Sequence, residues 1–474
     1  MSTIIPANSA SGPDVFDVDN SCRFEFPSTS YMTKSSSSVA NQTKFTISVW
    51  VKRSNNLTYS FSGFNNDMQI IGQTTSGHCR LMFNTTGSLQ FYGETRLDLK
   101  TNRKFKDFSA WYHIFIAVDT TQGTAANRVK MFINGVQETS LATATYPNQN
   151  DNISFFVNSQ NLVIGKSESV GGYDYLNAYL SEFVCLEGTT AAPTDFGEFD
   201  GDSGIWKPIE HAQSGNKGAN GFYLDFKDSS NLGNDAYGGT DFTESNLTAT
   251  DQSTDTCTNN FATIGILFTP LLPPIYSEGN LQSYSTAAGF YPIPSSIGVA
   301  NGKWYMELKY TATTANDNTG IGITMDPASG NQINTDQGGY VFGYSAPDGN
   351  LFPYQGEPSG SFASYTVGDI MGIYMDLDNM KLYFSKNGAL QSATGKTINV
   401  SNTGFYYFCV LDYTNTSNYW TWQWNFGGGC PFAISSGNTD ANDYGNFEYS
   451  PTITGDGASK DFFALCTKNL AEYG

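Results

Sequence analysis

The chain has few charged residues and few histidines, and this composition limits the classes of function that we expect. Only 14% of its 474 residues are charged, and 24 Lys and Arg face 44 Asp and Glu, for a net charge of −20. Nucleic-acid binding needs a basic patch that neutralises phosphates, and the sequence shows no such run. An acidic surface keeps a protein soluble and attracts cations. We therefore expect no nucleic-acid partner.

Cysteine is also scarce. The seven cysteines are widely spaced and odd in number, and no Cys-x-x-Cys pair occurs, so a zinc site is not expected. Unpaired cysteine is commonly buried, and we interpret these residues as buried free thiols. They are Cys22, Cys79, Cys185, Cys257, Cys409, Cys430 and Cys466.

Long apolar runs are missing. No stretch approaches the ~20 residues that a membrane-spanning helix needs. Residues 1–7 lack the basic and apolar parts of a secretory signal. We expect a protein without membrane insertion that is made in a cytoplasm and not exported by a signal peptide.

What is abundant indicates β structure. The chain holds 48 Gly, 28 Tyr and 34 Phe, and no stretch of helical period has caps at both ends. Aromatic residues suit half-buried pleated surfaces, and Gly and Asn suit tight turns. Because 474 residues exceed what one core supports, we expect an all-β protein of two antiparallel β-sandwich (jelly-roll) domains.

Two hairpin signatures stand in different halves of the chain. In each, an apolar strand that ends in Asp (residues 111–119 and 374–378) is followed by an alternating strand that runs into Asn134-Gly135 or Asn387-Gly388. Asn-Gly tolerates the positive φ of a type I′ turn and is the strongest short-range hairpin signal. The pair indicates two sandwich domains, and so recognition or assembly rather than chemistry.

Composition changes along the chain predict five segments. They are an N-terminal docking or capping arm (1–20), a first sandwich (21–187), an irregular connector (188–265), a second sandwich (266–434) and a C-terminal tail (435–474). We expect the connector to pack across both domains. The short apolar terminus predicts that the tail is held against the body or a neighbouring subunit.

The first sandwich resembles the laminin G-like jelly roll of the concanavalin A-like superfamily. The resemblance is carried, in order, by residues 45–53 (Phe-Thr-Ile-Ser-Val-Trp-Val-Lys-Arg), 111–113 (Trp-Tyr-His), 132–135 (Phe-Ile-Asn-Gly) and 180–183 (Leu-Ser-Glu-Phe). It covers about 165 residues and implies a jelly roll.

The second sandwich resembles a SPRY domain, which is also a bent β-sandwich and typically binds partners through its loops. The matching stretches are 302–307 (Gly-Lys-Trp-Tyr-Met-Glu), 321–323 (Ile-Gly-Ile), 368–372 (Gly-Asp-Ile-Met-Gly), 376–378 (Asp-Leu-Asp), 384–388 (Phe-Ser-Lys-Asn-Gly), 424–427 (Trp-Asn-Phe-Gly) and 431–432 (Pro-Phe).

Beyond the two domains, the chain carries the opening Asp-Asn-Ser-Cys-Arg-Phe (19–24) and the stretches 221–226, 251–261 and 276–281. This combination of parts resembles virion proteins of marine tailed bacteriophages, often described as tail-fibre or lectin-like. The resemblance implies a virion structural protein: a tail-fibre, head-fibre or adhesin subunit, expected as a homotrimer, that binds host surface glycan or docks to other virion proteins. Two other hypotheses stay open: a purely architectural component, and a polysaccharide hydrolase.

Loop aromatics are the candidate ligand-binding residues. Such rings can stack on sugars, although ordinary loop packing or a subunit contact is an equal alternative. A Trp ladder at positions 420, 422 and 424 is interpreted mainly as core, with Trp420 nearest the rim. The candidates are Tyr173, Asp174 and Tyr175 in a loop of the first domain; Tyr340, Tyr344, Asp348, Phe352 and Tyr354 in or beside a turn of the second; and Trp420.

Calcium is a possible cofactor, because several laminin G-like domains hold it with loop oxygens. Asp67 and Asp119 are the candidate ligands, with Asp19, Asn65 and Asn66 as further donors. No complete metal loop is present, so solvated turn carboxylates are the alternative interpretation. Otherwise no cofactor is expected.

Catalytic signals are few. Gly201-Asp202-Ser203-Gly204 is similar to a serine-protease nucleophile segment, but the three histidines lack the surroundings that such a site needs. No metalloprotease helix, phosphate loop or nucleophile elbow occurs, nor the paired glutamates of a glycanase strand. The sequence therefore predicts no enzyme activity.

Overall fold

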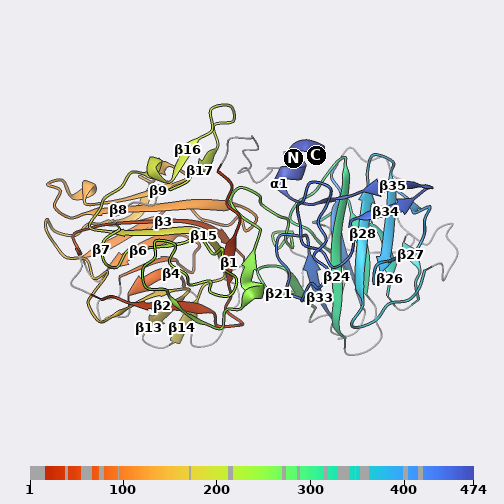
Figure 1. The fold of residues 1–474 in the computed structure, drawn as a ribbon, viewed down its shortest axis with the longest axis horizontal. Helices are drawn as coiled ribbons and strands as arrows, with labels where there is room; N and C mark the ends of the chain where they lie inside the picture. The colour runs from red at the N-terminus through yellow and green to blue at the C-terminus, as the bar shows by residue number, and fades with distance from the viewer. Residues whose placement is uncertain are drawn as a thin grey trace. The chain divides into compact units, whose positions relative to one another are not determined.

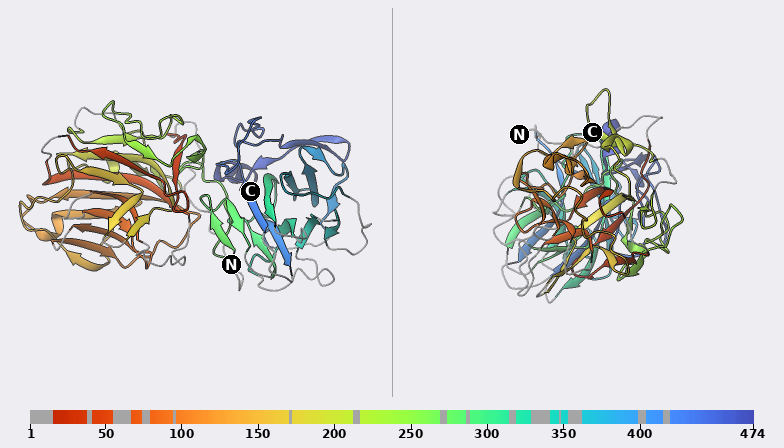
Figure 2. Two further views of the ribbon diagram at one scale, coloured as in Figure 1. Left: turned by 90° about the horizontal axis from the view of Figure 1, so that it is seen from below. Right: turned by 90° about the vertical axis from the view of Figure 1, so that its left-hand side faces the viewer.

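The computed structural model is almost entirely β, which confirms the expected fold class. The chain divides between Asn259 and Asn260 into two compact units, called here the first and the second domain (Figures 1 and 2). Within the described part of the chain, the one α-helix is α1 (Thr467–Tyr473). The structure describes residues 16–37, 41–54, 67–73, 79–93, 96–169, 172–211, 217–268, 274–285, 289–313, 319–328, 341–346, 348–352, 362–398, 404–414 and 420–474.

The first domain is a sandwich of two antiparallel eight-stranded sheets. The first sheet has the order β10-β9-β8-β3-β15-β1-β20, with β18 paired to β15, and the second has the order β11-β7-β6-β5-β4-β12-β2-β19. The first sheet comprises β1 Ser21–Phe24, β3 Lys44–Arg53, β8 Trp111–Asp119, β9 Val129–Ile133, β10 Val136–Gln137, β15 Ala178–Glu187, β18 Phe222–Leu224 and β20 Gln252–Ser253. The second comprises β2 Tyr31–Ser35, β4 Met68–Gln73, β5 Arg80–Phe83, β6 Leu89–Gly93, β7 Leu97–Thr101, β11 Leu141–Thr145, β12 Asn161–Ile164 and β19 Thr243–Ser245.

The centre of the first sheet is buried on both faces. Its central strands β3 and β15 are buried along almost their whole length. Ile47 and Val49 of β3 face the core between the sheets, whereas Trp50 packs on the opposite face against Trp111 and Trp206. Even the polar residues of these two strands are almost all buried, so burial along each strand does not alternate. The outer face therefore needs a cover, which comes from elsewhere in the chain.

The cover comes from the segment 188–265, which we expected to be a connector between the domains. Its residues up to Asn259 belong to the first domain instead. They form the hairpin of β16 (Gly197–Phe199) and β17 (Trp206–Pro208) and add β18, β19 and β20 to the sheets. The segment is thus not an irregular link but part of the sandwich. Six of its apolar side chains lie in the main core: Phe222, Leu224, Phe226, Leu232, Phe242 and Leu247.

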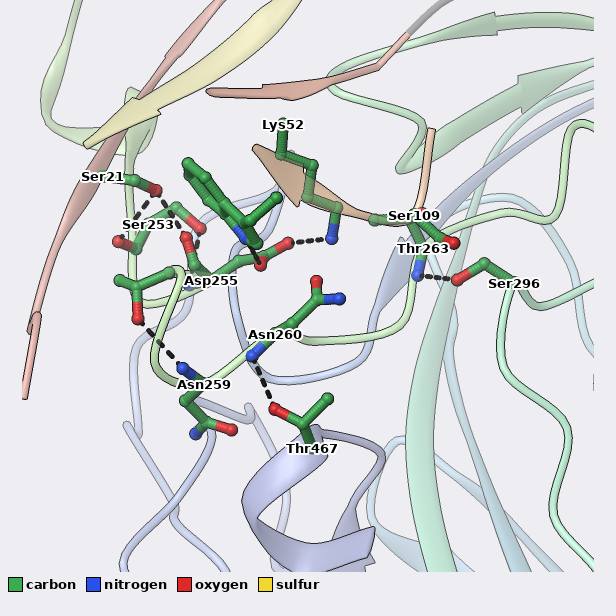
Figure 3. Close-up of polar contacts among 12 residues, drawn as sticks. Ser21, Lys52, Ser109, Ser253, Asp255, Asn259, Asn260, Thr263, Ser296 and Thr467 are labelled. Carbon is green, nitrogen blue, oxygen red and sulfur yellow. Dashed lines mark hydrogen bonds and ion pairs between the residues drawn. The ribbon is translucent and has the colours of Figure 1, made fainter. Parts of the chain in front are cut away.

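Asp255 ties the end of the first domain to its outer face. Its carboxylate lies 2.6 Å from the Lys52 Nζ and accepts a hydrogen bond of 3.1 Å from the Trp111 indole, and all three side chains are buried. The Ser21 hydroxyl donates to the Asp255 carbonyl at 2.7 Å (Figure 3). Near the N-terminus, Val18 belongs to the buried cluster that contains Trp50 and Trp111. The part of the N-terminal arm that the structure describes is therefore packed against the first domain.

The second domain has a nine-stranded and a five-stranded sheet, with orders β21-β22-β33-β24-β28-β29-β30 (β31 pairs β29, β36 pairs β24) and β23-β32-β25-β26-β27. The larger sheet comprises β21 Ile275–Ser277, β22 Gln282–Tyr284, β24 Lys303–Thr313, β28 Ile370–Asp376, β29 Lys381–Lys386, β30 Ala389–Leu390, β31 Lys396–Thr397, β33 Trp420–Asn425 and β36 Phe463–Ala464. The smaller comprises β23 Gly289–Pro294, β25 Thr319–Thr324, β26 Val341–Ser345, β27 Leu351–Phe352 and β32 Tyr407–Thr414.

The segment expected to be a C-terminal tail is an integral part of the second domain. Its apolar side chains Phe447, Ile453 and Phe462 pack with Tyr305 and Tyr374 of the larger sheet. Within the segment, β34 (Thr452–Gly455) and β35 (Ala458–Asp461) form a hairpin, and β36 joins β24 in parallel. The expected boundary at residue 434 is therefore wrong, because this face of the sheet would otherwise stand bare.

A buried carboxylate holds this C-terminal cover in place. Glu307 of β24 is fully buried and accepts backbone N–H bonds from Glu448 (3.0 Å) and Tyr449 (2.7 Å), and a 3.0 Å bond from Asn425. Burial raises the pKa of Glu307, while these hydrogen bonds act in the opposite direction. Donors that satisfy a buried carboxylate make its burial tolerable.

The two Asn-Gly turns are built alike, as the sequence predicts. Asn134 and Gly135 have φ of 49° and 75°, and Asn387 and Gly388 have φ of 48° and 78°, which is type I′ geometry. Each Asn side-chain oxygen also accepts a backbone N–H from the strand that pairs with the first strand of the turn on its other side, from His113 of β8 at 2.7 Å and from Ile370 of β28 at 2.9 Å. The same local chemistry thus shapes a turn in both domains.

An aromatic ring covers the glycine of each turn. A Cβ at Gly135 would lie 2.3 Å from the Trp206 ring, and one at Gly388 would lie 2.6 Å from the Tyr449 ring. Trp206 is fixed there because its indole donates to the His113 Nδ1 at 3.0 Å. Since Nδ1 accepts, the proton of neutral His113 is on Nε2, which faces the Ser48 hydroxyl at 2.9 Å.

Replacing Gly135 by Ala should destabilise the first domain by about 1–3 kcal/mol, because the turn needs a positive φ and the new methyl group meets Trp206. Denaturant unfolding of the full chain measures the effect. Gly123→Ala is the matched control, since a Cβ there meets nothing within 4 Å. Equal stability of the two variants would contradict the packing described.

Replacing Phe462 by Ala should cost the second domain about 3–5 kcal/mol, because this ring is fully buried between the C-terminal segment and the sheet. Phe463→Ala, at the half-buried neighbouring position, is the control and should cost clearly less. If thermal unfolding gives two small and similar losses, the C-terminal segment is not part of the domain.

Candidate functional site

The first domain keeps one polar sheet face at least partly open, on the outside of its second sheet. Leu81, Leu89, Phe91, Leu97 and Leu99 point into the core. Because side chains alternate along a strand, the intervening residues of β5, β6 and β7 point outward. Five of these outward residues are half-buried, and together they are called the polar strip: Arg80, Gln90, Tyr92, Asp98 and Lys100.

The members of the polar strip are direct neighbours across the sheet. Tyr92 of β6 is paired with Arg80 of β5 on one side and with Asp98 of β7 on the other, and Gln90 is paired with Lys100. The Arg80 guanidinium lies 5.7 Å from the centre of the Tyr92 ring. The Gln90 side-chain amide donates to Asp98 at 2.7 Å. The strip thus places the Tyr92 ring between side chains that can donate and accept hydrogen bonds and that hold one another in place.

Arg80 is held at its far end as well. Its guanidinium lies 3.8 Å from the Asp67 carboxylate and donates to the Ser167 hydroxyl at 3.3 Å. Ser167 belongs to β13 (Lys166–Ser169), which pairs with β14 (Gly172–Tyr175) and packs against β4. Burial raises the pKa of Asp67, although the Arg80 charge acts in the opposite direction. The hairpin therefore positions one end of the strip.

Sequence reasoning missed the polar strip, although a signal for it was present. The runs Leu-Gln-Phe-Tyr-Gly and Leu-Asp-Leu-Lys-Thr of β6 and β7 alternate strictly between apolar and polar residues, and their burial alternates likewise. Such alternation marks a strand with one face on the core and one open. The ligand-binding residues that the sequence predicts are mainly loop aromatics, whereas the polar strip lies on a sheet face.

The predicted loop around Tyr173, Asp174 and Tyr175 is a strand. All three residues lie in β14, so the assignment to a loop is wrong. Tyr175 is half-buried, with its ring centre 5.8 Å from that of Phe26. The side chains of Tyr173 and Asp174 lie outside what the structure describes.

The structure places the predicted ligand-binding residues of the second domain in different environments. Tyr344 of β26 is fully buried and packs on Tyr365, so it presents no ring at the surface. Asp348 is exposed, and its carboxylate accepts hydrogen bonds from the backbone and side chain of Asn350, which closes the predicted turn. The backbone of Phe352 lies in β27, whereas its side chain, together with Tyr340 and Tyr354, falls outside the described residues.

The Trp ladder of β33 is core, as the favoured interpretation has it. Trp422 and Trp424 are fully buried, and their indoles donate to Thr319 and Ser283, each at 3.0 Å. Trp420 is also buried, at 2% exposure, so the expectation that it reaches the rim is wrong. Its register opposite Thr313 continues the inward face of the strand.

The candidate calcium ligands each have other partners. Asp119 accepts from the Thr121 hydroxyl and the Gln122 amide and lies 3.4 Å from Lys44; these hydrogen bonds lower its pKa although burial opposes them. Asp67 is engaged by Arg80, Asp19 lies 3.8 Å from Lys227, and Asn65 and Asn66 fall outside the described residues. Among the residues that the structure places, no three His, Cys, Asp or Glu side chains gather as a metal site.

Ser203 has a structural role in its turn. Its hydroxyl donates to the Asp200 carboxylate at 2.8 Å, and the Ser203 backbone N–H donates to the same oxygen at 2.9 Å. This is the hydrogen bonding of a tight turn between β16 and β17. The resemblance of this tetrapeptide to a protease nucleophile is therefore accounted for by the turn.

Glu182 is a buried carboxyl of the first domain with a raised pKa. It sits in β15 at a break of register opposite β3, with a φ of 48°, and is 9% exposed. Burial raises its pKa to about 7, while a 2.6 Å hydrogen bond from the Tyr223 hydroxyl acts in the opposite direction. The bulge that turns this side chain has no signal in the sequence.

Two segments of the chain match known domain families. Residues 26–189 match the concanavalin A-like lectin/glucanases superfamily in its laminin G group, and residues 303–421 match the SPRY domain. The chain therefore contains a lectin-like domain and a SPRY domain, as the resemblances implied. Both kinds of domain are typically non-catalytic binding modules.

Curated relatives match only a small part of the chain. The Ran-binding proteins 9/10 homolog of Drosophila melanogaster is 32% identical over 115 residues, which cover 23% of this chain and 11% of the fly protein. Ran-binding protein 10 of Danio rerio is 26% identical over 118 residues, 24% of this chain and 18% of the fish protein. The chain thus spans less than a fifth of the length of either relative.

Similar solved structures include the SPRY domain of human HERC1, at 20% identity and a TM-score of 0.27 over 32% of this chain and 91% of that one. A heptameric SAP-like pentraxin from Limulus polyphemus is 15% identical, with a TM-score of 0.26 over 36% of this chain and 78% of its own. Among the described residues of this protein, no helix is long and apolar enough to cross a membrane.

The contribution of Glu182 to the free energy of unfolding of the first domain should fall as pH rises from about 4.5 to about 7. In the unfolded chain this carboxyl ionises near its usual pKa, whereas in the folded domain it keeps its proton to about 7. Ionisation thus favours unfolding by about 1.4 kcal/mol per pH unit in that window.

Glu182→Gln removes this titration and keeps an acceptor for Tyr223. The unfolding free energy of the variant should therefore rise relative to wild type between pH 4.5 and 7, as followed by urea unfolding at several pH values. Glu198→Gln, at an exposed carboxylate of β16, is the matched control. A difference between Glu182→Gln and wild type that stays constant with pH would refute the assignment.

Proposed function

We propose that this chain is a non-catalytic recognition protein of a bacteriophage virion, a tail-fibre, head-fibre or adhesin subunit whose lectin-like domain binds host surface glycan through the polar strip. The virion setting rests on the sequence resemblance carried by residues 19–24, 221–226, 251–261 and 276–281. The glycan rests on the chemistry of the strip, which is independent of that setting.

The observation that carries the proposal is the half-exposed ring of Tyr92 set among polar neighbours. A sugar offers C–H faces that pack on an aromatic ring, and hydroxyls that both donate and accept hydrogen bonds. Arg80 and Lys100 supply donors, Asp98 supplies acceptors, and Gln90 supplies both. These side chains are preorganised by one another and by the sheet, which lowers the entropy lost on binding.

The strip suits binding rather than hydrolysis. Glycoside hydrolysis needs two carboxyl groups that flank the scissile bond, one as acid and the other as nucleophile or base. The polar strip holds a single carboxylate, Asp98, and its oxygen already accepts the Gln90 amide. We therefore propose binding without cleavage.

Weak sugar contacts would gain affinity from repetition. Several copies on one particle raise the effective concentration of each further contact. The SPRY domain would dock to other virion proteins through its loops, as such domains bind partners. In a purely architectural component, the same surfaces would contact only neighbouring subunits.

Replacing Tyr92 by Ala should weaken glycan binding by about tenfold or more, because the stacking surface is lost. The full chain is tested on an array of bacterial surface glycans, and the best binder is then titrated by calorimetry. Tyr284→Ala, at a half-buried tyrosine of β22 in the second domain, is the matched control. No binding on the array, or equal loss in both variants, would remove the strip as a glycan site and favour the architectural role.

A further inference from the structure

Strand β11 (Leu141–Thr145) is an open edge of the second sheet of the first domain. It pairs with β7 on one side, and no other strand of the described structure pairs with its second side. Ala142, Ala144 and Thr145 are exposed, and Leu141 and Thr143 are half-buried. Along an antiparallel strand, alternate residues point their backbone N–H and C=O groups away from the paired neighbour, so β11 leaves these groups without a strand partner on its second side.

The other sheet edges are short, charged or interrupted by proline, which are the usual protections against edge-to-edge pairing. In the described parts of both sandwiches, β10, β20, β27, β30 and β31 have two residues each and β21 has three. Strand β19 has three residues including Glu244, and the six-residue β23 contains Pro292 and Pro294. Strand β11 is the one sandwich edge of five residues that carries neither charge nor proline. A register shift between Leu141 and Thr143 is its one irregularity.

The open edge is also held in place at both ends. Before it, the Ser140 carbonyl accepts the Asn102 N–H at 3.0 Å, and the Ser140 N–H donates to Glu138 at 3.0 Å. After it, the Pro147 carbonyl accepts from the Arg128 guanidinium at 2.8 Å. A strand fixed in this way loses little conformational entropy when another strand is added to it.

We infer that β11 pairs antiparallel with β11 of a second copy of this chain. Centred on Thr143, the pairing sets Leu141 against Thr145 and Ala142 against Ala144, so that small, uncharged side chains meet. Residues 139–150 are free of charge in a chain whose net charge is −20. Two copies can thus approach at this edge without setting like charges directly opposite each other, which a charged edge would not permit.

The pairing has a consequence for the polar strip. An antiparallel contact between identical edges is isologous, with a two-fold axis perpendicular to the joined sheet, so both copies show the same face on the same side. Two strips would then lie on one continuous surface, separated by β11 of each copy. This consequence rests on the proposed function, whereas the pairing itself does not.

The experiment measures the mass of the full chain in solution, without glycan, by sedimentation velocity over a range of concentrations. Wild type should form a dimer, whereas Thr143→Lys should be a monomer at the same concentrations, since two lysines would face each other across the axis. Thr243→Lys is the matched control, an exposed threonine on the opposite edge strand β19 of the same sheet, and should remain a dimer. Thr143→Glu should be a monomer alone and should form a heterodimer when mixed with Thr143→Lys.

Each outcome decides the matter. A wild-type monomer, or a trimer as the virion resemblance implies, with Thr143→Lys of unchanged mass, would overturn the pairing. A variant that fails to fold shows as lost circular dichroism, and the mixture of Thr143→Lys and Thr143→Glu then decides by whether a dimer returns. Because glycan is absent, failure here leaves the array result untouched, and failure on the array leaves the mass untouched.

Discussion

The structure depends on burying one sheet of each sandwich on both faces. This is the centre of the first sheet in the first domain and the larger sheet in the second domain. In the first domain, β3 and β15 are buried on both faces, so a jelly roll that ended near residue 187 would expose Trp50 and Trp111. Residues 188–259 supply the missing cover and lock it with Asp255. In the second domain, the residues after 434 cover Tyr305 and Tyr374, and the buried Glu307 carboxylate holds them by accepting backbone hydrogen bonds.

This constraint decides where function can reside in the first domain. The centre of the first sheet is covered, whereas β6 and β7 of the second sheet alternate between buried side chains and half-buried ones on its outer face. The polar strip and the open edge β11 both belong to this sheet. The glycan binding and the self-association that we propose therefore both use the second sheet.

Local features could be predicted from the sequence, and long-range ones could not. The Asn-Gly turns and the core role of Trp422 follow from turn chemistry and strand periodicity, which act over a few residues. The cover of the first sheet uses strands of two or three residues, and β20 pairs with β1 across more than 200 residues of chain, for which no periodic signal exists. The burial of Tyr344 could not be predicted, because an aromatic residue beside a turn has the same sequence pattern whether it faces solvent or the core.

The central claim is that the polar strip is the recognition surface, and a crystal structure of the full chain with a bound oligosaccharide tests it most directly. The account predicts electron density for a sugar ring stacked on Tyr92, with hydroxyls in hydrogen-bond reach of Arg80 and Asp98. Density at any other surface, with the strip unoccupied at saturating ligand, would contradict it.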